Sequence, residues 1–420
     1  MLRRVVVTGL GFITSVGNNR GEVLKSLRTQ RSGIEIHPEL DQPEIPYKLA
    51  GTIKGFDFSG YHRETWKFPQ GLTIPRTTLR GLPPHGVFAY AAMQEAVADA
   101  GLSDEQVSDA RTGLMCASAG STRMLYRNVE KMLKDGIQRC HPNAVSMSIA
   151  GTLNFNLVAA FKIHGAATGF VDACSSSAIA FGHALDLVRH NRQDIVFVVG
   201  AEDCDIFSIL PFGCCRALTS GTDPSQYPCA FDVKRDGFAA TGGAAVLVLE
   251  ELDHARQRGA KTYAEALGWG QTSDGYDVMA PEPEGEGLRR AMHDAMQDAK
   301  VEAGEIDYVN AHATATPLGD PAECRALRKV FRDSSPLISS TKSQTGHALS
   351  MAGALEAAIC CMSIKEQFTP VSLNITELDL ECEGLCIVTS AIDHVPRTVI
   401  SNSSAFGGAN VSLVLRTLEA

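Results

Sequence analysis

The sequence lacks the marks of several protein classes. No stretch approaches the roughly 20 apolar residues that cross a bilayer, and none of the twelve cysteines falls in the paired C-x-x-C spacing of a zinc site. Its formal net charge of -10 has the wrong sign for attraction to nucleic acid or to an anionic membrane. We therefore expect no nucleic acid, no membrane and no metal among its partners.

We expect neither a leader nor an interdomain linker in this sequence. The apolar run that opens the sequence is broken at Thr8, Gly9 and Gly11 before it reaches the length of a signal peptide. Without such a signal, the unpaired cysteines predict a cytoplasmic protein with reduced thiols. No Pro/Ser-rich segment divides the 420 residues, so two closely packed halves are favoured over separate domains.

What the sequence does contain is an alternation of Val- and Ile-rich runs with helical stretches, which predicts α/β architecture with buried sheets. Apolar residues at helical spacing cover 87–99 and 178–189. After the first apolar run, Gly9-Leu10-Gly11 lacks the third glycine of a dinucleotide-binding loop and predicts only a tight turn. The expected strands are 5–8, 113–118, 195–200, 244–250, 306–310, 337–340, 385–389, 398–401 and 411–415.

Cys174 stands between a strand-like approach and a helix-forming segment, in the run VDACSSS that begins at Val171. A free cysteine is more often a buried packing residue. At the first turn of a helix, however, unpaired N–H groups and the helix dipole favour the thiolate. The small neighbours would also let a substrate carbonyl approach, so Cys174 is a candidate nucleophile.

Two histidines lie in loops that follow expected strands. His312 stands in NAHATATP and His347 in STKSQTGHA. Proteins of the α/β class place reactive groups in such loops, and two neutral imidazoles can each donate an N–H to one carbonyl oxygen. Histidines interpreted instead as surface or core residues are His37, His62, His190 and His254.

A glycine-rich turn, NSSAFGGAN, lies between the last two expected strands. It either serves only as a hairpin with positive φ angles, or presents a backbone N–H to an oxyanion while Phe406 closes a pocket. Earlier, Asp320 is followed by Pro321 and, three residues on, by Glu323, which is the pattern of a helix N-cap. Both acids are interpreted first as helix caps and second as supports of the His312 loop.

These four motifs, in this order and spacing, resemble the β-ketoacyl-acyl carrier protein synthases, specifically the elongating Cys-His-His type. The similarity runs over nearly the whole chain. The resemblance implies a thiolase-type fold in which two similar α/β halves, 1–255 and 256–420, stack as αβαβα layers and pair as a dimer. Further matches are VTGLG from Val7, FD from Phe231, RDGF from Arg235 and TSD from Thr272.

The resemblance also implies a mechanism. Cys174 would take an acyl group from the phosphopantetheine thioester of an acyl carrier protein. A malonyl thioester would then lose carbon dioxide and attack that acyl group to give a β-ketoacyl product. His312 and His347 would stabilise the enolate, and the N–H groups of Cys174 and Phe406 would form the oxyanion hole. No cofactor is implied beyond the phosphopantetheine that the carrier brings.

Other residues take secondary roles by the same resemblance. Lys342 and Glu356 would organise the histidine environment, with a purely structural salt bridge as the alternative. Further expected site residues are Gly407 and Gly408 in the gating turn, Thr314 and Thr316 on the pantetheine arm, Gly120, Phe212 and Ser404 at the acyl pocket, and Asp320 and Glu323 as supports.

The sequence departs from the family at the gating turn, where Ser404 and Ala405 replace an aromatic residue and a glycine. Alanine resists positive φ, so a less mobile turn is expected, and Gly120 in place of a bulkier residue predicts a roomy acyl tunnel. Both housekeeping fatty acid synthesis and a specialised polyketide or polyene pathway fit these departures.

Two alternatives share the fold. One is a non-catalytic, chain-length-factor-like subunit, which typically lacks the cysteine, and the other is an initiating synthase that uses coenzyme A thioesters and replaces one histidine by asparagine. The joint presence of Cys174, His312, Lys342 and His347 favours the elongating synthase. Its expected partners are acyl carrier protein, acyl and malonyl thioesters, and a second identical or related subunit. Candidates for a basic patch that meets the acidic carrier are Arg76, Arg80, Arg127, Lys131 and Arg216.

Overall fold

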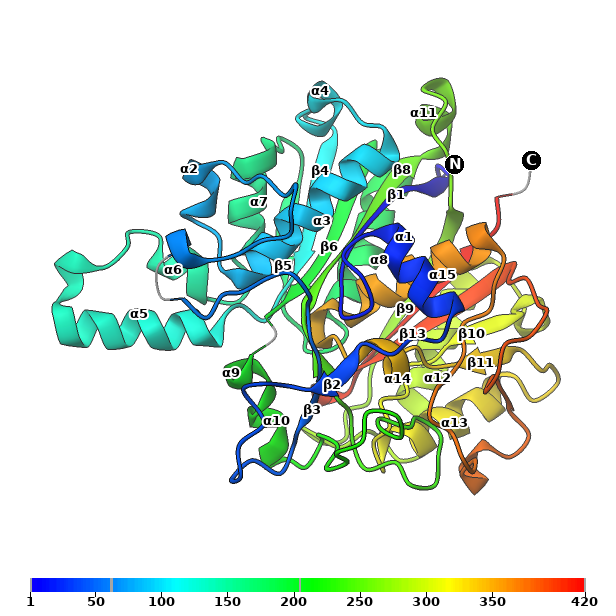
Figure 1. Cartoon of the computed structure of the whole chain (residues 1–420). Helices are drawn as coiled ribbons and strands as arrows, with labels where there is room; N and C mark the ends of the chain where they lie inside the picture. Colours follow the sequence, from blue (N-terminus) through cyan, green and yellow to red (C-terminus); the bar gives the residue numbers. More distant parts are fainter. Residues whose placement is uncertain (1, 61–62, 204, 419–420) are drawn as a thin grey trace.

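The computed structural model describes residues 2–60, 63–203 and 205–418. Within these ranges the main sheet has eleven strands in the order β12-β11-β10-β13-β14-β9-β1-β8-β6-β4-β5, and a small sheet has the order β2-β3-β7 (Figure 1). The strands are β1 Val5–Ile13, β2 Ile34–Ile36, β3 Leu49–Gly51, β4 Thr112–Ala117, β5 Ala167–Phe170, β6 Ile195–Glu202, β7 Ala240–Thr241, β8 Gly243–Glu251, β9 Ala264–Ser273, β10 Tyr308–Asn310, β11 Leu337–Ser339, β12 Cys386–Ile387, β13 Thr398–Ser404 and β14 Ala409–Arg416.

Helices connect most of these strands. The α-helices are α1 Arg20–Arg28, α2 Arg76–Leu79, α3 Pro84–Ala100, α4 Asp104–Val107, α5 Thr122–Asp135, α6 Ala144–Ser148, α7 Leu153–Phe161, α8 Ser176–Arg189, α9 Ile206–Ile209, α10 Pro211–Cys214, α11 Leu252–Gln257, α12 Glu286–Ala299, α13 Gly319–Val330, α14 Lys342–Thr345 and α15 Ala352–Glu366. The short 3-10 turns are η1 Arg63–Thr65, η2 Ile137–Arg139, η3 Ala303–Glu305, η4 Leu349–Met351, η5 Leu380–Cys382 and η6 Phe406–Gly408.

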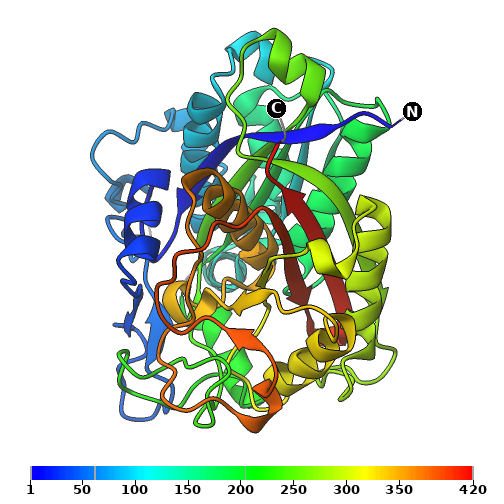
Figure 2. The ribbon, with the colours of Figure 1, turned by 90° about the vertical axis from the view of Figure 1, so that its right-hand side faces the viewer.

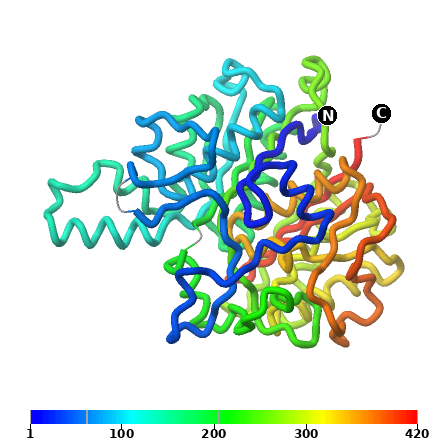
Figure 3. The backbone as a smooth tube through the Cα atoms, viewed as in Figure 1, coloured from blue at the N-terminus to red at the C-terminus, as the bar shows by residue number. Residues whose placement is uncertain are grey.

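The pairing of strands repeats along the main sheet. In the first half β1, β8 and β6 pair antiparallel in turn, and β6, β4 and β5 run parallel. The second half repeats this pattern with β9, β14, β13, β10 and β11. The halves meet where residues 5–7 of β1 pair with residues 264–266 of β9. Figure 3 shows the cyan part of the chain on the left and the yellow-to-red part on the right. The duplication, which no sequence repeat reveals, is therefore present in the topology.

The helices arrange the two half-sheets into layers. On the outer face of the first half, α3 packs against β1 and β8, and on the outer face of the second, α12 packs against β9 and β14. Between the half-sheets, α8 and α15 pack on each other and on strands of both halves (Figure 2). The layers thus run αβαβα, and the α/β, thiolase-type architecture is confirmed.

The central helix α15 shows why this layering follows from the sequence. Its residues 352–364 are all buried, and a helix that is apolar on every side belongs inside a protein rather than at its surface. Glu356 is the one charged residue among them, and it forms an ion pair with Lys342. Among the helices of the described ranges, none has the length and apolarity needed to cross a membrane.

The tight turn expected at Gly9 and Gly11 is wrong, because β1 continues to Ile13. A Cβ at Gly11 would lie 1.9 Å from the carbonyl oxygen of Ala92 in α3, and a Cβ at Gly9 would lie 2.6 Å from that of Ala96. Real side-chain atoms cannot approach backbone so closely. The two glycines therefore let the outer helix pack directly on the strand.

Candidate active site

Cys174 lies in the sharp connection between β5 and α8. The N-cap of α8 is Ser175, so Cys174 precedes the first helical residue by two positions. The residue before it, Ala173, has a φ of 44°, a conformation that few non-glycine residues adopt. The turn leaves Cys174 only 8% exposed and places its Sγ 3.0 Å from Nε2 of His347.

The electrostatic setting of Cys174 corrects one expectation. Burial raises the pKa of its thiol to about 12, with Glu202 adding to the effect and Lys342 opposing it. The expected thiolate is therefore wrong for this resting site, because the loss of hydration outweighs the pull of the helix N-terminus. Burial, helped by Lys342, also holds the pKa of His347 well below its usual range. The pair is a neutral thiol beside a neutral imidazole, and Nε2 can accept the thiol proton.

His312 follows β10 and is held by the carboxylate of Glu323. The N–H groups of His312 and Ala313 donate to that carboxylate at 3.0 and 2.7 Å, and Nδ2 of Asn402 donates a third hydrogen bond at 3.1 Å. The imidazole ring lies 5.3 Å from that of His347, nearly perpendicular to it. Burial is the main cause that holds the pKa of His312 well below its usual range, so both rings are neutral near pH 7.

The start of α13 differs from its expectation. The helix begins at Gly319 with Leu318 as its N-cap, so Asp320 does not cap it. Instead Asp320 accepts hydrogen bonds from the N–H groups of Phe231 at 2.9 Å and Thr316 at 3.3 Å, and burial raises its pKa to about 6. Asp320 and Glu323 were each interpreted as a helix cap or as a support of the His312 loop. Because both accept hydrogen bonds from N–H groups of loops, the structure supports the second interpretation.

Lys342 and Glu356 form an ion pair inside the protein. Nζ of Lys342, at the start of α14, contacts Oε1 of Glu356 in α15, and the two side chains are only 2% and 3% exposed. Burial raises the pKa of Glu356 to about 7, although Lys342 opposes this. The charge of Lys342 also lowers the pKa of Cys174 and of both histidines. Lys342 thus acts on all three groups, whereas Glu356 acts on Cys174, where it raises the pKa.

A cavity of about 390 Å³ opens onto Cys174, His312 and His347. Several expected residues line it, and some lining residues were not expected. Expected lining residues are Thr314, Thr316, Phe212, Ser404 and Phe406, with Arg216 from the basic candidates, and unexpected ones include Phe238, Met279, Ala280, Pro281 and Leu318.

Contacts within this cavity define its walls. The hydroxyl oxygens of Thr314 and Thr316 lie 3.1 Å apart, on the side of the histidine loop. The ring of Phe212 packs 6.1 Å from that of Phe406, and Phe238 stands edge-on to His347 at 4.9 Å. The cavity therefore has a polar side along the threonines and an aromatic side beside the nucleophile.

The glycine-rich turn forms η6 between the antiparallel strands β13 and β14. Gly407 and Gly408 have φ angles of 81° and 76°, as expected, and the Gly407 N–H donates to the carbonyl oxygen of Val278 at 2.8 Å. Ala405 has a φ of -136°, which is extended backbone that alanine adopts freely. Ser404 donates its hydroxyl to Oδ1 of Asn410 at 2.8 Å. This conformation of the turn therefore accommodates both departures from the family pattern.

Gly120 is not among the residues that line the catalytic cavity. Its φ is 84°, and a Cβ there would lie 2.7 Å from the amide nitrogen of Ala150 and 2.9 Å from the carbonyl oxygen of Ser148. The glycine is required by this backbone packing. Its expected place beside the acyl chain stays a prediction.

Four of the five basic candidates surround a second cavity, of about 400 Å³. Arg76 and Arg80 come from α2 and its end, and Arg127 and Lys131 come from α5. Arg63, His141 and Glu64 complete its charged lining. A strongly basic hollow thus exists on a chain whose net charge is negative.

Three of the histidines interpreted from the sequence as surface or core residues contact residues close to them in the chain. Nδ1 of His37 accepts the N–H of Glu39 at 3.2 Å, and His190 and His254 contact residues four positions earlier in the chain. His62 lies outside the described residues.

The geometry of the catalytic group also allows a second interpretation. Atoms of Cys174, His312 and His347 that can bind metals lie within 4.8 Å of one another, close enough to hold a metal ion.

Comparison with known proteins gives the class. Family models for the N-terminal and C-terminal domains of β-ketoacyl synthases match residues 2–255 and 263–376. The 3-oxoacyl-[acyl-carrier-protein] synthase 1 of Haemophilus influenzae is 40% identical over 420 residues, which cover 99% of each chain, and that of Escherichia coli K12 is 39% identical over 423 residues, covering all of both. The crystal structure of a β-ketoacyl synthase from Burkholderia phymatum has a TM-score of 0.90 at 34% identity, covering 99% of this chain and 100% of the other.

The fold and these similarities define a condensing acyltransferase. The chain belongs to the β-ketoacyl synthase family. Because relatives near 40% identity over the whole chain are 3-oxoacyl synthases, neither the non-catalytic subunit nor the initiating synthase is favoured.

Proposed function

We propose that this enzyme carries a growing acyl group on Cys174 and condenses it with malonyl units, both delivered by an acyl carrier protein. One observation carries this: the Cys174 thiol, two neutral histidines and the field of the Lys342–Glu356 pair converge on one cavity. That convergence supplies a nucleophile, an acceptor for its proton and donors for a developing oxyanion.

The first step is acyl transfer. Sγ of Cys174 attacks the thioester carbonyl, and its proton passes to Nε2 of His347, which lies 3.0 Å away. The backbone N–H groups of Cys174 and Phe406 stabilise the oxyanion of the tetrahedral intermediate. The bond between the carbonyl carbon and the pantetheine sulfur then breaks, and that sulfur takes the proton from His347.

The second step is decarboxylative condensation. The bond to the malonyl carboxylate breaks, carbon dioxide leaves, and the electron pair forms a thioester enolate. An N–H group of each neutral ring, that of His312 and that of His347, stabilises its oxygen. His347, whose Nε2 faces Cys174, donates from Nε2 after its ring proton has moved there from Nδ1. The enolate carbon attacks the acyl carbonyl on Cys174, whose sulfur leaves with the electron pair and is reprotonated from solvent. In the same cavity Thr314 and Thr316 face the pantetheine arm.

The basic cavity fits the carrier protein, which is acidic. Arg76 and Arg80 can contact acidic side chains or the phosphate of phosphopantetheine, and such rim charges mainly govern the rate of association. Reversing both to glutamate should slow loading from acyl carrier protein and reduce its salt dependence. Loading from a small acyl pantetheine thioester should stay unchanged. The double variant Arg332→Glu with Arg397→Glu, outside this cavity, serves as a control with the same change in net charge. Equal loss with both substrates would contradict this docking site.

A second copy of the chain is the partner that the surface supports. β5 lies at the open end of the strand order, and an unpaired edge strand invites pairing. Large apolar side chains near it are exposed, among them Val145, Phe155 and Val171, and α5 projects from the body of the molecule (Figure 1). Light scattering should give the mass of a dimer, and Val171→Asp should shift it toward the monomer. A wild-type monomer at micromolar concentration would contradict this arrangement.

Variants of the two histidines test the mechanism, because acyl loading and malonyl decarboxylation can be measured separately. His312→Ala and His347→Ala should retain acyl loading in part but lose decarboxylation of malonyl carrier, measured as release of carbon dioxide. Intact mass spectra of the enzyme offered a panel of acyl carriers would show which chain lengths load, and so choose between housekeeping and specialised pathways. Decarboxylation at the wild-type rate in both histidine variants would sink the proposed roles.

A further inference from the structure

A second, smaller cavity lies beside the catalytic cavity, on the side of His312. Its volume is about 40 Å³, which is room for roughly one or two non-hydrogen atoms, since a water molecule in the liquid occupies about 30 Å³. The residues that line both cavities are Pro281, His312, Thr314, Gly319 and Ser404. This side cavity therefore shares walls with the space in which the substrate reacts.

The carboxyl groups that line the side cavity already have hydrogen-bond partners. Asp274 accepts from Nδ2 of Asn410 at 2.7 Å and from the N–H of Glu282 at 3.0 Å. Glu282 accepts two N–H groups that follow it in the chain, at 3.1 and 2.8 Å, and Glu323 accepts three hydrogen bonds. The apolar part of the lining consists of Pro281, Leu288, Ala313 and Ala322. An apolar group can therefore enter without leaving a polar group unpaired.

Ser404 is the small residue at which the two cavities meet. It pairs with Asn410 across β13 and β14, and its hydroxyl donates to Oδ1 of that residue at 2.8 Å. This hydrogen bond keeps the Ser404 side chain beside its neighbour in the sheet. Because Ser404 lines both cavities, a bulkier side chain, such as the aromatic one of the family pattern, would take up space in one or both. The serine thus leaves the side cavity open.

The position of His312 relates the side cavity to the substrate. In the proposed condensation this ring stabilises the oxygen of the malonyl thioester, and the α-carbon is bonded to the carbonyl carbon that carries this oxygen. A substituent on the α-carbon therefore lies close to His312, a wall of the side cavity. We propose that the side cavity receives a small alkyl substituent on the α-carbon, so that the enzyme also condenses methylmalonyl thioesters, and that Ser404 determines this specificity.

This inference rests on the proposed condensation, whose chemistry it keeps. The bond from the α-carbon to the carboxylate breaks, carbon dioxide leaves, and the electron pair forms a methyl-substituted thioester enolate. The enolate carbon attacks the acyl carbonyl on Cys174, whose sulfur leaves with the electron pair and takes a proton from solvent. The product is an α-methyl-β-ketoacyl thioester on the carrier protein.

The choice between two extender units tests this inference. The full-length enzyme, first acylated on Cys174, is offered malonyl or methylmalonyl carrier protein, and mass spectrometry of the products gives kcat/KM for each. In the wild type, kcat/KM with methylmalonyl carrier should be within about tenfold of that with malonyl carrier. A site that lacks room for one methyl group discriminates by about 10- to 200-fold.

Variants that fill the side cavity should lower the ratio of methylmalonyl to malonyl kcat/KM by about tenfold or more. Ser404→Phe fills it at the shared wall. Ala322→Val fills it from α13, outside the catalytic cavity, and should keep the rate with malonyl carrier. Ser404→Ala is the matched control, because it loses the hydrogen bond to Asn410 but keeps the space, and it should retain the wild-type ratio. Thermal unfolding checks that each variant folds.

Three results would overturn the inference. The first is a wild type that extends with malonyl carrier but falls short of the expected ratio with methylmalonyl carrier. The second is an unchanged ratio in both Ser404→Phe and Ala322→Val. The third is a Ser404→Ala variant that loses as much as Ser404→Phe, since the hydrogen bond and not the space would then be the cause. An enzyme that extends with neither carrier would instead contradict the proposed function.

Discussion

The Lys342–Glu356 pair allows the site to be tested quantitatively. Lys342→Met keeps the length of the side chain and removes the ammonium group. The buried carboxyl of Glu356, with a pKa already raised to about 7, is then left without its cation. Removing one partner of a buried ion pair costs about 3–5 kcal/mol of stability, and we expect a loss in this range.

The double variant Lys342→Met with Glu356→Gln separates stability from electrostatics. Replacing both charges removes the uncompensated carboxyl, so most of the lost stability should return. The electrostatic effect on the histidines should not return, because it comes from the charge of Lys342, which lowers the pKa of both His312 and His347 and is absent from both variants. Without it their pKa values rise, and the acid limb of the pH profile for malonyl decarboxylation should move to higher pH in the single and the double variant alike.

Urea unfolding followed by tryptophan fluorescence measures the first effect, and carbon dioxide release across pH measures the second. A single variant within about 1 kcal/mol of the wild type would refute the buried pair. A double variant no more stable than the single one would refute the coupling. An unmoved acid limb in both variants would show that the charge of Lys342 does not reach the histidines.

Two further predictions concern packing and metal. Gly11→Ala forces a Cβ to within 1.9 Å of the Ala92 carbonyl oxygen, so it should cost about 1–3 kcal/mol or more in urea unfolding, whereas Gly304→Ala, where a Cβ meets nothing within 4 Å, should be neutral; equal effects would contradict the packing of α3 on β1. Chelators should leave condensation unchanged and added zinc should inhibit it by capturing the Cys174, His312 and His347 atoms that lie within 4.8 Å of one another; loss of activity on chelation with recovery on adding zinc would instead establish a metalloenzyme.

The strands that the sequence predicts well are those buried along their whole length, such as β8, where every residue is buried. The sequence does not predict β5, because its four residues, partly or fully exposed, carry no apolar pattern. It does not predict β9 either, because Gly268 and Gly270 interrupt the strand. Those glycines serve a distant contact: a Cβ at Gly268 would lie 2.4 Å from the amide nitrogen of Ala299 in α12. Local pattern cannot reveal a requirement that tertiary packing imposes.

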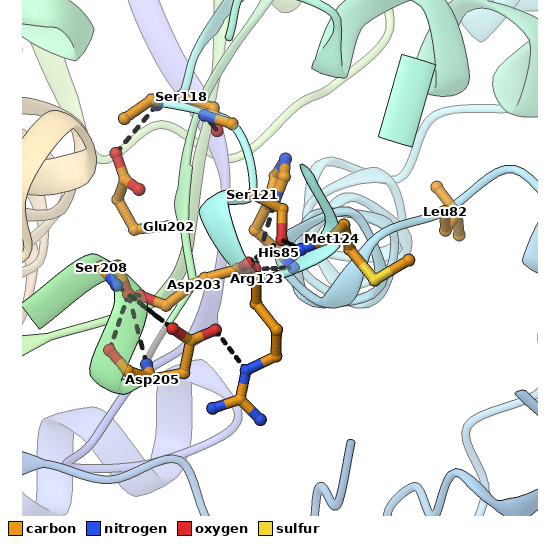
Figure 4. A network of polar contacts seen from close by, with 12 residues as sticks. Leu82, His85, Ser118, Ser121, Arg123, Met124, Glu202, Asp203, Asp205 and Ser208 are labelled. Carbon is orange, nitrogen blue, oxygen red and sulfur yellow. Dashed lines mark hydrogen bonds and ion pairs between the residues drawn. The ribbon is translucent and has the colours of Figure 1, made fainter. Parts of the chain in front are cut away.

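The candidate site shows the same division. Motifs identify Cys174, His312 and His347, because the few residues next to each of them in the sequence are enough to indicate a reactive group. The sequence does not predict the raised pKa of Cys174, because the helix terminus is a local feature, whereas burial depends on tertiary contacts such as that with His347, 173 residues away. Nor does it single out Glu202, which adds to this effect and which Figure 4 shows turned toward the segment at Ser118, because the hydrogen-bond partners of Glu202 are 83 and 148 residues away.

The central claim, that Cys174 carries the acyl group, is tested most directly by intact mass spectrometry after incubation with acyl carrier protein. The wild-type chain should gain the mass of one acyl group, located on the peptide that contains Cys174, and malonyl carrier should discharge it. Cys174→Ala should gain nothing. An acyl adduct on the Cys174→Ala protein, or one located on another of the twelve cysteines, would contradict the mechanism.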